Sequence, residues 1–491
     1  MSRDVKAGAE PSEITVALGR HAAAKPAHPA FVFDGITLSR MELIEQVEEL
    51  AAWFARTLPA AARLALVLPG GAAFLTAFLA GVRAGCNVQV LNPDWPERLR
   101  AEVVERLRPD LVVTAAEALP PADTAAAALP SPSIDIPFYT GFTSGSTGLP
   151  KGFVRTQRSW LDSFVSDQAE FGYGADDIFA VPGSFAHSMP LYGTLRGLYA
   201  GARVLCLGAM RPDRMLDAMI TENATVLYAV PTQVQAIVEA AERSGTTAPT
   251  VRLVLTGGAK ASEALKARIS AVFPEAEFVE FYGTSELSYV TVARAGERPP
   301  PSSVGRPFSG VRVHILDAAG ASLPAGEVGQ IFVESPFRFL GYALAEGGGA
   351  QQVSDALPGA IAVGDTGFLD DGGFLHLVGR TDRMIVSSGR NIHPEAVEMV
   401  LEQHTGVARA AVFGVDDPLR GKRLVAVIAP RPDAAPPTAA TLARHVAAAL
   451  PAHSVPHRFL RLDDWPLTMS GKSDFPEIEA RLAAGGLDRV P

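Results

Sequence analysis

Residues 143–152 read Thr-Ser-Gly-Ser-Thr-Gly-Leu-Pro-Lys-Gly, so hydroxyls, glycines and one lysine are concentrated in a short segment. Glycines allow backbone N–H groups to approach oxygen atoms closely, hydroxyls donate hydrogen bonds, and Lys151 supplies a positive charge. This mixture predicts a loop that binds a polyphosphate, although its spacing is not that of the common P-loop. A flexible Ser/Gly linker has a similar composition. The apolar run at residues 136–140 leads into the segment as a strand does, however, which favours the phosphate loop.

The first half of the chain alternates short apolar runs with stretches of helical pattern. Such alternation is typical of βαβ units and largely parallel sheets. Residues 64–82 carry no charge and are long enough to resemble a membrane span, but Pro69, Gly70 and Gly71 interrupt them. We therefore expect a buried strand at 64–68 and a helix at 72–82. Further strands are expected at 88–91, 111–114, 178–181, 203–207, 226–230 and 251–256.

The pattern changes after Gly305. Short alternating strands with glycine turns are expected at residues 305–333, and the glycine-rich residues 341–350 predict a mobile loop. After Arg380, helices are expected at 394–403 and 441–450 and strands at 410–415 and 424–429. The expected fold class is α/β, in two domains. A large N-terminal domain of parallel βαβ sheets with a small β-barrel-like subdomain covers residues 1–381, and a small, mobile α+β C-terminal domain covers residues 382–491.

Composition places the chain among ordinary globular proteins. Of its 491 residues, 48% are hydrophobic and 20% are charged, which is typical of that class. The net charge of −10 gives no attraction to nucleic acid, so no nucleic-acid partner is expected. The first residues lack the apolar segment of a secretion signal, and no integral membrane segment is expected. Because Cys86 and Cys206 match no metal or redox spacing, the cytoplasm is the expected compartment.

The segment at 143–152 resembles the signature loop of the adenylate-forming superfamily, which includes acyl-CoA synthetases, adenylation domains and luciferases. Four further segments match the superfamily in the same order along about two thirds of the chain, and this order is stronger support than any one motif. They are Phe-Tyr-Gly-Thr-Ser-Glu at 281–286, Val-Gly-Asp at 363–365, Gly-Arg-Thr-Asp-Arg at 379–383 and Pro-Leu-Thr-Met-Ser-Gly-Lys at 466–472. The resemblance implies an acid–thiol ligase that uses ATP, Mg2+ and CoA.

The resemblance also assigns roles in nucleotide binding. Tyr282 would stack on adenine, and Glu286 would help to hold Mg2+ together with waters and phosphate oxygens. Asp365 would accept hydrogen bonds from both ribose hydroxyls. The full set of cofactor-binding residues implied is Thr143, Ser144, Gly145, Ser146, Thr147, Lys151, Gly257, Gly258, Ala259, Tyr282, Gly283, Thr284, Ser285, Asp365, Arg380 and Gly389.

The catalytic residues implied are Lys472, Glu286 and His187. Lys472 would bring positive charge to the α-phosphate as the carboxylate attacks, which is usually a leading catalytic contribution. Without the other motifs, a lone lysine near the C-terminus would be a solvated surface charge. Asp382 would be the hinge about which the small domain swings, withdrawing Lys472 and exposing a pantetheine channel near Gly389.

Two departures from the superfamily narrow the expected activity. Val386 stands where many members have lysine, which counts against luciferase-type oxidation. Ala186 stands where amino-acid-activating domains often have aspartate, and since it cannot pair with an ammonium group, an α-amino acid substrate is not expected. His187 resembles the gate residue of acyl-CoA synthetases, with a histidine that caps the next helix as the alternative.

Apolar residues beside His187 indicate a pocket for a small to medium acyl or aryl group: Phe185, Met189, Leu191 and Tyr192. Arg196 would be the counter-charge if the substrate were instead a dicarboxylic acid, although a surface arginine on a helix is the simpler expectation.

The function expected is ATP-dependent activation of a small-molecule carboxylic acid to an acyl-adenylate, with pyrophosphate release, followed by transfer to CoA. One alternative is an adenylation enzyme that loads a separate acyl carrier protein. Another is a nucleotide-binding regulatory protein without turnover. The presence of Lys151, Glu286, Asp365, Arg380 and Lys472 argues against that last alternative.

Overall fold

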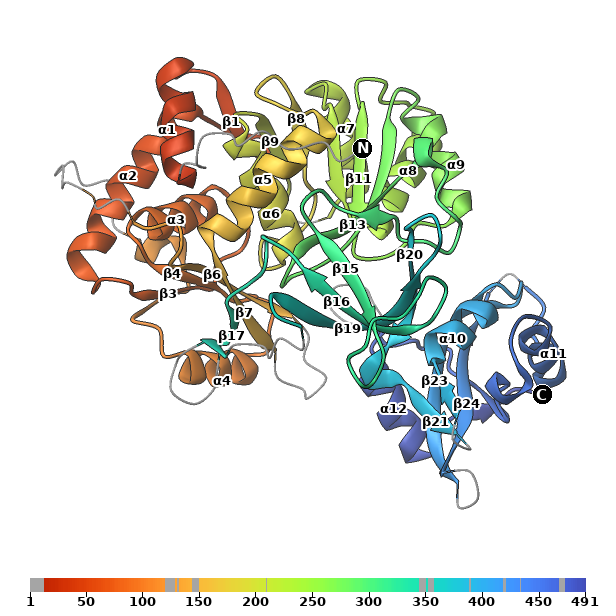
Figure 1. The fold of residues 1–491 in the computed structure, drawn as a ribbon. Helices are drawn as coiled ribbons and strands as arrows, with labels where there is room; N and C mark the ends of the chain where they lie inside the picture. Colours follow the sequence, from red (N-terminus) through yellow and green to blue (C-terminus); the bar gives the residue numbers. More distant parts are fainter. Residues whose placement is uncertain are drawn as a thin grey trace. The chain divides into compact units, whose positions relative to one another are not determined.

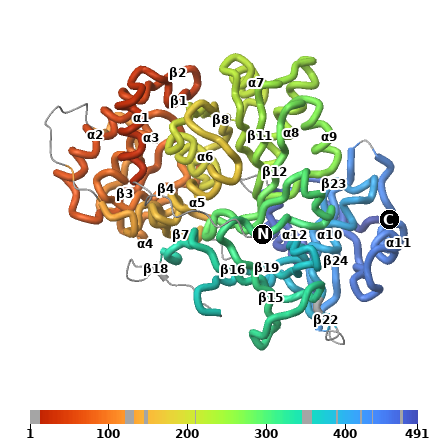
Figure 2. The backbone as a smooth tube through the Cα atoms, turned by 45° about the horizontal axis from the view of Figure 1, so that its top comes forward, coloured from red at the N-terminus to blue at the C-terminus, as the bar shows by residue number. Residues whose placement is uncertain are grey.

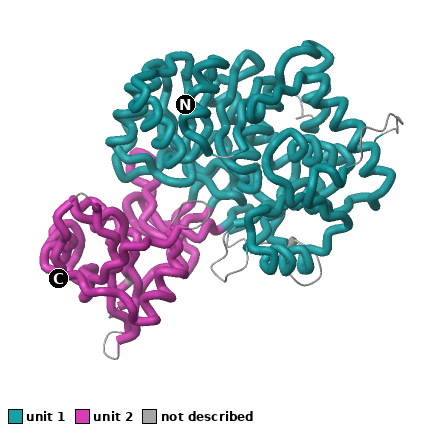
Figure 3. Tube along the Cα trace, turned by 180° about the vertical axis from the view of Figure 1, so that it is seen from behind, with its two compact units in different colours: residues 1–313, 333–361 teal, residues 314–332, 362–491 magenta. Residues whose placement is uncertain are grey.

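The computed structural model describes most of the chain and divides it into two compact units (Figure 3). The first unit comprises residues 1–313 and 333–361, and the second comprises residues 314–332 and 362–491. The boundary after residue 381 that the sequence indicates stays a prediction. The residues described are 13–119, 129, 132–143, 150–208, 210–343, 350–351, 357–387, 390–417, 421–432, 434–467 and 473–491.

A nine-stranded sheet forms one half of the first unit, with strand order β14-β13-β12-β11-β10-β8-β9-β1-β2. Its central strands, from β12 through β1, pair in parallel, whereas β2, β13 and β14 are added antiparallel. The strands are β1 (Pro29–Phe33), β2 (Ile36–Ser39), β8 (Ile178–Ala180), β9 (Arg203–Cys206), β10 (Val226–Ala229), β11 (Leu253–Gly257), β12 (Glu277–Thr284), β13 (Ser288–Arg294) and β14 (Arg306–Pro307).

Three helices cover part of this sheet because each has one apolar face. They are α7 (Pro212–Thr221), α8 (Pro231–Ser244) and α9 (Glu263–Val272). Residues such as Met219, Ile237 and Ile269 from these helices form one buried cluster with Leu227 and Val254 of the strands. The helices lie near β11 in both views (Figures 1 and 2). The remaining helices around the two sheets of this unit are α1 (Ile14–Ala24), α2 (Arg40–Thr57), α3 (Ala72–Arg83), α4 (Glu97–Leu107), α5 (Gln157–Phe171) and α6 (Ser188–Tyr199).

A seven-stranded sheet completes the first unit, with strand order β18-β17-β7-β6-β4-β3-β5. Strands β5, β3, β4 and β6 pair in parallel, and β7 returns antiparallel to β6. The strands are β3 (Arg63–Leu66), β4 (Asn87–Val90), β5 (Leu111–Val113), β6 (Pro137–Thr143), β7 (Lys151–Thr156), β17 (Gly341–Ala343) and β18 (Ala350–Gln351). Each of the parallel strands predicted from the sequence is present, so the α/β class is confirmed.

The charge-free stretch at 64–82 forms β3 and α3, as its Pro-Gly-Gly interruption predicts. Gly71 precedes the helix with a φ of +150°, a backbone conformation that favours glycine. A Cβ at Gly81 would lie 2.8 Å from side-chain carbons of Leu64 and Val88, so the helix packs directly on β3 and β4. The stretch lacks charge because it is buried in the protein core. Within the described ranges, no helix has both the length and the apolar character that a membrane crossing requires.

Two four-stranded sheets and a short hairpin lie mainly in the second unit. One sheet has the order β15-β16-β19-β20 and the other β23-β24-β25-β26. The elements are β15 (Arg312–Leu316), β16 (Gly329–Glu334), β19 (Ala360–Leu369), β20 (Leu375–Arg380), β21 (Ile385–Ser387), β22 (Arg390–Ile392), α10 (Pro394–Glu402), β23 (Val407–Asp417), β24 (Gly421–Pro430), α11 (Ala439–Ala449), β25 (Arg458–Arg461), α12 (Phe475–Ala484) and β26 (Asp488–Arg489). The predicted loop at 341–350 lies mostly outside the described residues.

Alternating side chains of β23 and β24 give the last sheet two apolar faces. Val412 and Ala426 face a core that includes residues of α10 and α11. Ala411 and Val425 instead belong to a second core that includes Ile478 of α12. This sheet is therefore covered on both sides by helices from its own part of the chain.

Candidate active site

The predicted phosphate loop joins two paired strands. Thr143, the last residue of β6, lies opposite Lys151, the first residue of β7, in the antiparallel register. Lys151 is exposed. The loop thus begins and ends at the same end of the β6–β7 pair, as the strand-like lead into it predicts. Ser144, Gly145, Ser146 and Thr147 lie outside the described residues.

A second glycine-rich element lies at the carboxyl end of β11. Gly257 pairs with Phe281 of β12, and a Cβ at position 257 would lie 2.4 Å from the Phe281 ring. Gly258 follows with a φ of +82°, and both Gly258 and Ala259 are exposed. Thr256 precedes them with a buried hydroxyl oxygen that has no hydrogen-bond partner within the described ranges. This element is placed where ligands bind in open α/β sheets, at the carboxyl ends of parallel strands.

The neighbouring strand β12 ends in a tight turn into β13. A bulge lies between Tyr282 and Gly283, and Thr284 pairs with Ser288 across the turn. A Cβ at Gly283 would lie only 1.9 Å from the backbone oxygen of Ser288. Glycine is therefore required here by close backbone approach. Residues 282–286 are half-buried at this strand end, and we call residues 284–288 the β12–β13 turn.

Contacts from three other segments fix the β12–β13 turn. The hydroxyl of Tyr342 donates to Oε1 of Glu286 at 2.9 Å, and the backbone N–H of Phe339 donates to the Glu286 carbonyl at 2.8 Å. The hydroxyls of Ser188 and Ser285 lie 3.2 Å apart. The position of Glu286 is thus fixed at both its backbone and its side chain.

The guanidinium of Arg155 also holds the turn. It donates to the carbonyl of Ser285 at 2.7 Å and to the hydroxyl of Ser288 at 3.0 Å. Sequence reasoning missed Arg155, Tyr342 and Ser188. For Arg155 a signal existed, because an arginine directly after the apolar pair Phe153-Val154 has to find partners if the strand is buried.

These residues fit a Mg2+ ion that is held mainly by substrate oxygens. Within the described part of the chain, no group of three or more His, Cys, Asp or Glu side chains is placed to hold a metal ion. Mg2+ is commonly bound through one or two carboxylates, with phosphate oxygens and waters as the other ligands. Glu286, oriented by Tyr342, supplies one such carboxylate, so the donor set fits Mg2+ bound with ATP.

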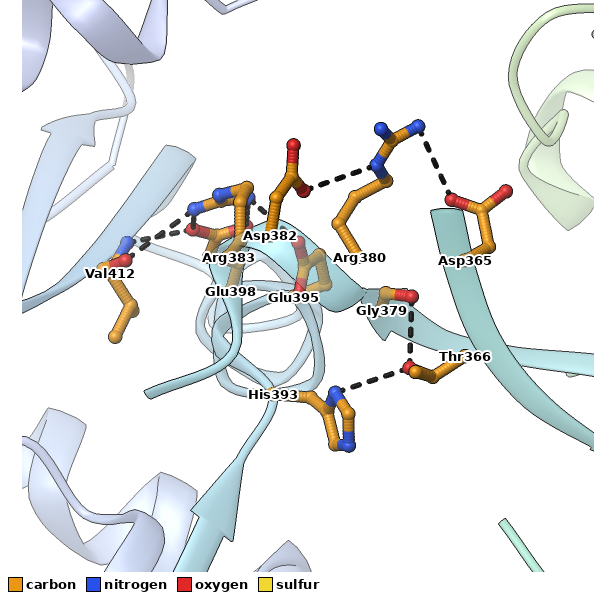
Figure 4. Close-up of polar contacts among 10 residues, drawn as sticks. All are labelled: Asp365, Thr366, Gly379, Arg380, Asp382, Arg383, His393, Glu395, Glu398 and Val412. Carbon is orange, nitrogen blue, oxygen red and sulfur yellow. Dashed lines mark hydrogen bonds and ion pairs between the residues drawn. The ribbon is translucent and has the colours of Figure 1, made fainter. Parts of the chain in front are cut away.

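In the second unit, Asp365, Arg380 and Asp382 lie together (Figure 4). Asp365 and Arg380 are paired across β19 and β20, and Arg380 Nη1 lies 3.5 Å from Asp365 Oδ1. Arg380 Nε donates to Asp382 Oδ1 at 3.3 Å. The structure therefore brings together three residues that the sequence assigns to ribose binding and to the hinge. Those roles stay predictions.

Arg383, the residue after Asp382, is anchored far more firmly (Figure 4). Its guanidinium donates to Glu398 at 2.6 and 3.1 Å and to Glu395 at 3.1 Å. Its Cζ atom lies 3.7 Å from the ring centroid of Phe475, a cation–π contact. Burial raises the pKa of Glu398, with Arg383 opposing that shift. We call Arg383, Glu395 and Glu398 the Arg383 anchor, which sequence reasoning did not identify.

The same region contains a histidine whose protonation opposes folding. Thr366 donates to the carbonyl of Gly379 at 3.0 Å and lies 3.3 Å from Nδ1 of His393 (Figure 4). Burial lowers the pKa of His393, with Glu395 opposing. As pH falls below about 6.5, the unfolded chain therefore binds the proton first and stability is lost. The contribution of neutral His393 to stability is fully present above about pH 6.5. It is lost as the pH falls from there through the lower pKa of the folded state.

We expect the His393→Gln protein to lose less stability than the unsubstituted protein between pH 7.5 and 5. Urea unfolding monitored by circular dichroism at several pH values measures this slope for the second unit. His28→Gln, in the first unit, is the control and should leave the pH dependence of the second unit unchanged. Equal slopes for His393→Gln and the unsubstituted protein would contradict the prediction.

His187 and Phe185 lie in the segment that leads into α6. His187 is the N-cap residue of α6, but its side chain makes no capping hydrogen bond; the gate role stays a prediction. Phe185 is buried against Phe33 and Phe74, with ring centroids 6.4 and 5.4 Å away. These rings come from distant segments of the chain, and the expected role of Phe185 in lining a substrate pocket stays a prediction.

Arg196 is fully buried. The simpler expectation, a surface arginine on a helix, is therefore wrong. It forms an ion pair with the equally buried Asp167 at 2.9 Å and donates to the hydroxyl of Tyr289 at 2.6 Å. Burial raises the pKa of Asp167, with Arg196 and three tyrosine hydroxyls opposing. A counter-charge for a second substrate carboxylate would have to compete with Asp167. Lys472 and Gly389 lie outside the described residues.

Comparisons with known proteins show the family of the chain. A model of the family described as "AMP-binding enzyme" matches residues 18–343, and one described as "AMP-binding enzyme C-terminal domain" matches residues 396–472. The chain is similar to the protein named "Uncharacterized acyl–CoA ligase YhfT" of Bacillus subtilis (strain 168), with 36% identity over 449 residues, covering 87% of this chain and 89% of that protein. It is also similar to the fatty acid–[acyl-carrier-protein] ligase ScoC of Streptomyces coeruleorubidus, with 29% identity over 349 residues, 69% of this chain and 66% of that protein.

A solved structure shares the fold. The o-succinylbenzoate coenzyme A synthetase MenE from Bacillus subtilis, in complex with ATP and a magnesium ion, has a TM-score of 0.83 at 23% sequence identity. The match covers 94% of this chain and 99% of that chain.

Proposed function

Because this chain belongs to the family of AMP-binding enzymes, we propose that it is an AMP-forming ligase that joins a carboxylic acid to the thiol of CoA. The observation that carries the proposal is the β12–β13 turn. Glu286 is held there by Tyr342 and Phe339, beside the exposed glycine-rich end of β11. A fixed carboxylate and accessible backbone at one strand end suit a Mg2+–triphosphate group.

The reaction has two steps. A carboxylate oxygen of the acid attacks the α-phosphorus of ATP, the bond from that phosphorus to the bridging oxygen breaks, and pyrophosphate leaves. The thiol of CoA, after losing its proton, then attacks the acyl carbon and AMP leaves with the electron pair of the broken C–O bond. Forming the mixed anhydride first turns an unreactive carboxylate into a good acyl donor.

The residues of this chain have separate roles in that scheme. Lys151 and Lys472 supply positive charge to the phosphates, and Tyr282 stacks on adenine. Mg2+ held by Glu286 and the phosphate oxygens would neutralise charge on the leaving pyrophosphate. Asp365 accepts the ribose hydroxyls, and Asp382 acts as the hinge that removes Lys472 before the second step.

CoA is the preferred thiol. The relative named as an acyl–CoA ligase has a higher sequence identity to this chain, over a larger share of it, than the relative named as a fatty acid–[acyl-carrier-protein] ligase. The alternative is a separate acyl carrier protein, which the similarity to a fatty acid–[acyl-carrier-protein] ligase keeps open. Both reactions share the adenylation step and differ only in the thiol.

Pyrophosphate release tests the proposal directly. The full chain is mixed with ATP, Mg2+ and a panel of aliphatic, aryl and dicarboxylic acids, with and without CoA. We expect release that depends on the acid and that CoA accelerates, together with formation of a thioester detected by mass spectrometry. Acid-dependent release that CoA leaves unchanged would favour the carrier-protein alternative. No release with any acid would contradict the proposal.

A further inference from the structure

Arg155 is a fully buried cation whose hydrogen bonds reach four points of the chain. The residue is 1% exposed. Its Nε donates to the hydroxyl of Ser159 at 3.0 Å, and Nη1 donates to the carbonyl of Ser285 at 2.7 Å. Its Nη2 donates to the hydroxyl of Ser288 at 3.0 Å and to the carbonyl of Phe337 at 2.6 Å. Two of the four acceptors belong to the β12–β13 turn.

The segments that Arg155 joins are those that carry the predicted nucleotide site. Arg155 lies in β7, the strand that begins at Lys151 and follows the phosphate loop. The turn that it holds carries Glu286. Phe337, whose carbonyl also accepts a hydrogen bond from Arg155, precedes Tyr342, the residue whose hydroxyl orients the Glu286 carboxylate. One side chain therefore connects the end of the phosphate loop, the carboxylate and the segment that orients the carboxylate.

We propose that Arg155 is the positioning residue of this site: it holds the β12–β13 turn against β7, and thereby sets Glu286 where it binds Mg2+ together with the phosphates. The inference rests on the proposed function. Arg155 acts through the turn and not on the substrate, so its effect should appear in how the protein uses Mg2+. This role goes beyond the motifs in the sequence, none of which includes residue 155.

An arginine is suited to this task by its shape and charge. Its guanidinium offers five N–H donors in a rigid plane, whereas lysine offers one ammonium on a flexible chain. Burial lowers the pKa of Arg155 to about 10, with Tyr192, Glu286 and Tyr139 opposing the shift. The side chain is therefore still charged at neutral pH. Attraction between this cation and Glu286 adds to the hydrogen bonds that keep the turn in place.

A purely structural role would predict a different result from a positioning role. If Arg155 only stabilises the fold, its replacement lowers stability and leaves the Mg2+ requirement of the folded protein unchanged. If Arg155 positions Glu286, the two residues are coupled, and removing either one weakens the same Mg2+ interaction. A double-mutant cycle on Mg2+ dependence separates these possibilities.

The experiment compares the full-length Arg155→Met, Glu286→Gln and doubly substituted proteins with the unsubstituted protein. Binding of a fluorescent ATP analogue is titrated with Mg2+, at a temperature well below the unfolding transition of each protein. Each single substitution should raise the Mg2+ concentration for half-saturation about tenfold, and the double substitution should also raise it about tenfold, because coupled effects do not add. Additive effects, near 100-fold, or a change below about twofold in Arg155→Met would overturn the proposal.

Two further variants complete the test. Arg294 is a partly buried arginine of the same unit and pairs with Glu170 and Glu277. Arg294→Met is therefore the control, and it should leave the Mg2+ titration unchanged. If Arg155→Met does not fold, Ser288→Gly replaces it. Ser288 has a φ of +59°, which glycine accepts readily, and the substitution removes one contact of Arg155 with the turn. Ser288→Gly should raise the Mg2+ concentration for half-saturation about threefold. No rise in that concentration would overturn the proposal.

The nucleotide titration also distinguishes this inference from the proposed function. If the unsubstituted protein binds Mg2+–ATP but releases no pyrophosphate with any acid, the proposed ligase activity fails while the role of Arg155 is still measured. If the unsubstituted protein does not bind Mg2+–ATP, both proposals are wrong. If the protein is an active ligase and Arg155→Met binds Mg2+–ATP normally, only the inference about Arg155 fails.

Discussion

Replacing Lys472 with alanine is expected to slow acyl-adenylate formation by about 10²–10³-fold, the range found when one preorganised charge or donor is removed from a transition state. Negative charge rearranges around the α-phosphorus as the carboxylate attacks and pyrophosphate leaves. A lysine that contacts this group mainly in the transition state lowers the barrier and adds little to ground-state binding. The Kd for ATP should therefore change by less than about threefold.

The two half-reactions provide the measurement and its internal control. Acid-dependent exchange between pyrophosphate and ATP reports the first step, and thioester formation from chemically supplied acyl-adenylate and CoA reports the second. Lys472→Ala should lose the first activity and keep the second. Lys422→Ala, at an exposed lysine of the same unit, should retain both. Equal loss of both half-reactions in Lys472→Ala would show that the substitution damages the fold and would contradict the assigned role.

Replacing Arg196 with methionine is expected to lower the free energy of unfolding of the first unit by about 3–5 kcal/mol, the usual cost of leaving one partner of a buried ion pair uncompensated. Asp167 would keep its tyrosine contacts but lose the cation paired with it. Arg196 also lies against three rings, with its Cζ atom 4.4 Å from the ring centroid of Tyr228, 4.9 Å from that of Tyr173 and 5.2 Å from that of Phe179. The substitution removes these cation–π contacts as well.

The double variant Arg196→Met with Asp167→Leu should recover part of the loss, because removing both charges avoids a buried unpaired carboxylate. Recovery should be incomplete, since tyrosine hydroxyls that now donate to Asp167 would lose their acceptor. Urea unfolding monitored by near-ultraviolet circular dichroism measures both proteins. A loss below about 1 kcal/mol for Arg196→Met, or a changed preference between mono- and dicarboxylic acids in a stable protein, would contradict this interpretation and restore Arg196 as a substrate contact.

The features that the sequence predicted well are those specified by neighbouring residues. Pro69, Gly70 and Gly71 separate a buried strand from a buried helix, and the structure has β3 and α3 on either side of them. Gly257 and Gly283 occur in the matched motifs, and both are required because a Cβ at these positions would lie 2.4 Å from the Phe281 ring and 1.9 Å from the Ser288 backbone oxygen, respectively. Features of this kind can be predicted because the residues that determine them are neighbours in the sequence.

The features that the sequence did not reveal depend on partners far away in the chain. Arg155 contacts residues 130 to 182 positions later, and nothing near it in the sequence indicates which carbonyls it meets. Phe185 is expected to line a substrate pocket, and the local sequence does not reveal that its ring packs against Phe33 and Phe74. The hinge motif identified Arg380 and Asp382, whereas the stronger contacts belong to Arg383, whose partners lie in α10.

The contrast between Arg380 and Arg383 means that dissolved salt will act unequally on the two sides of Asp382. The side chains of Arg380 and Asp382 are 50% and 56% exposed, so mobile ions screen their attraction effectively. The side chains of Arg383 and Glu398 are only 20% and 10% exposed, and their attraction is screened much less. Rising ionic strength should therefore weaken the Arg380–Asp382 contact while the Arg383 anchor stays fixed, so that any torsional freedom gained at Asp382, the predicted hinge, is confined to one side of a single residue.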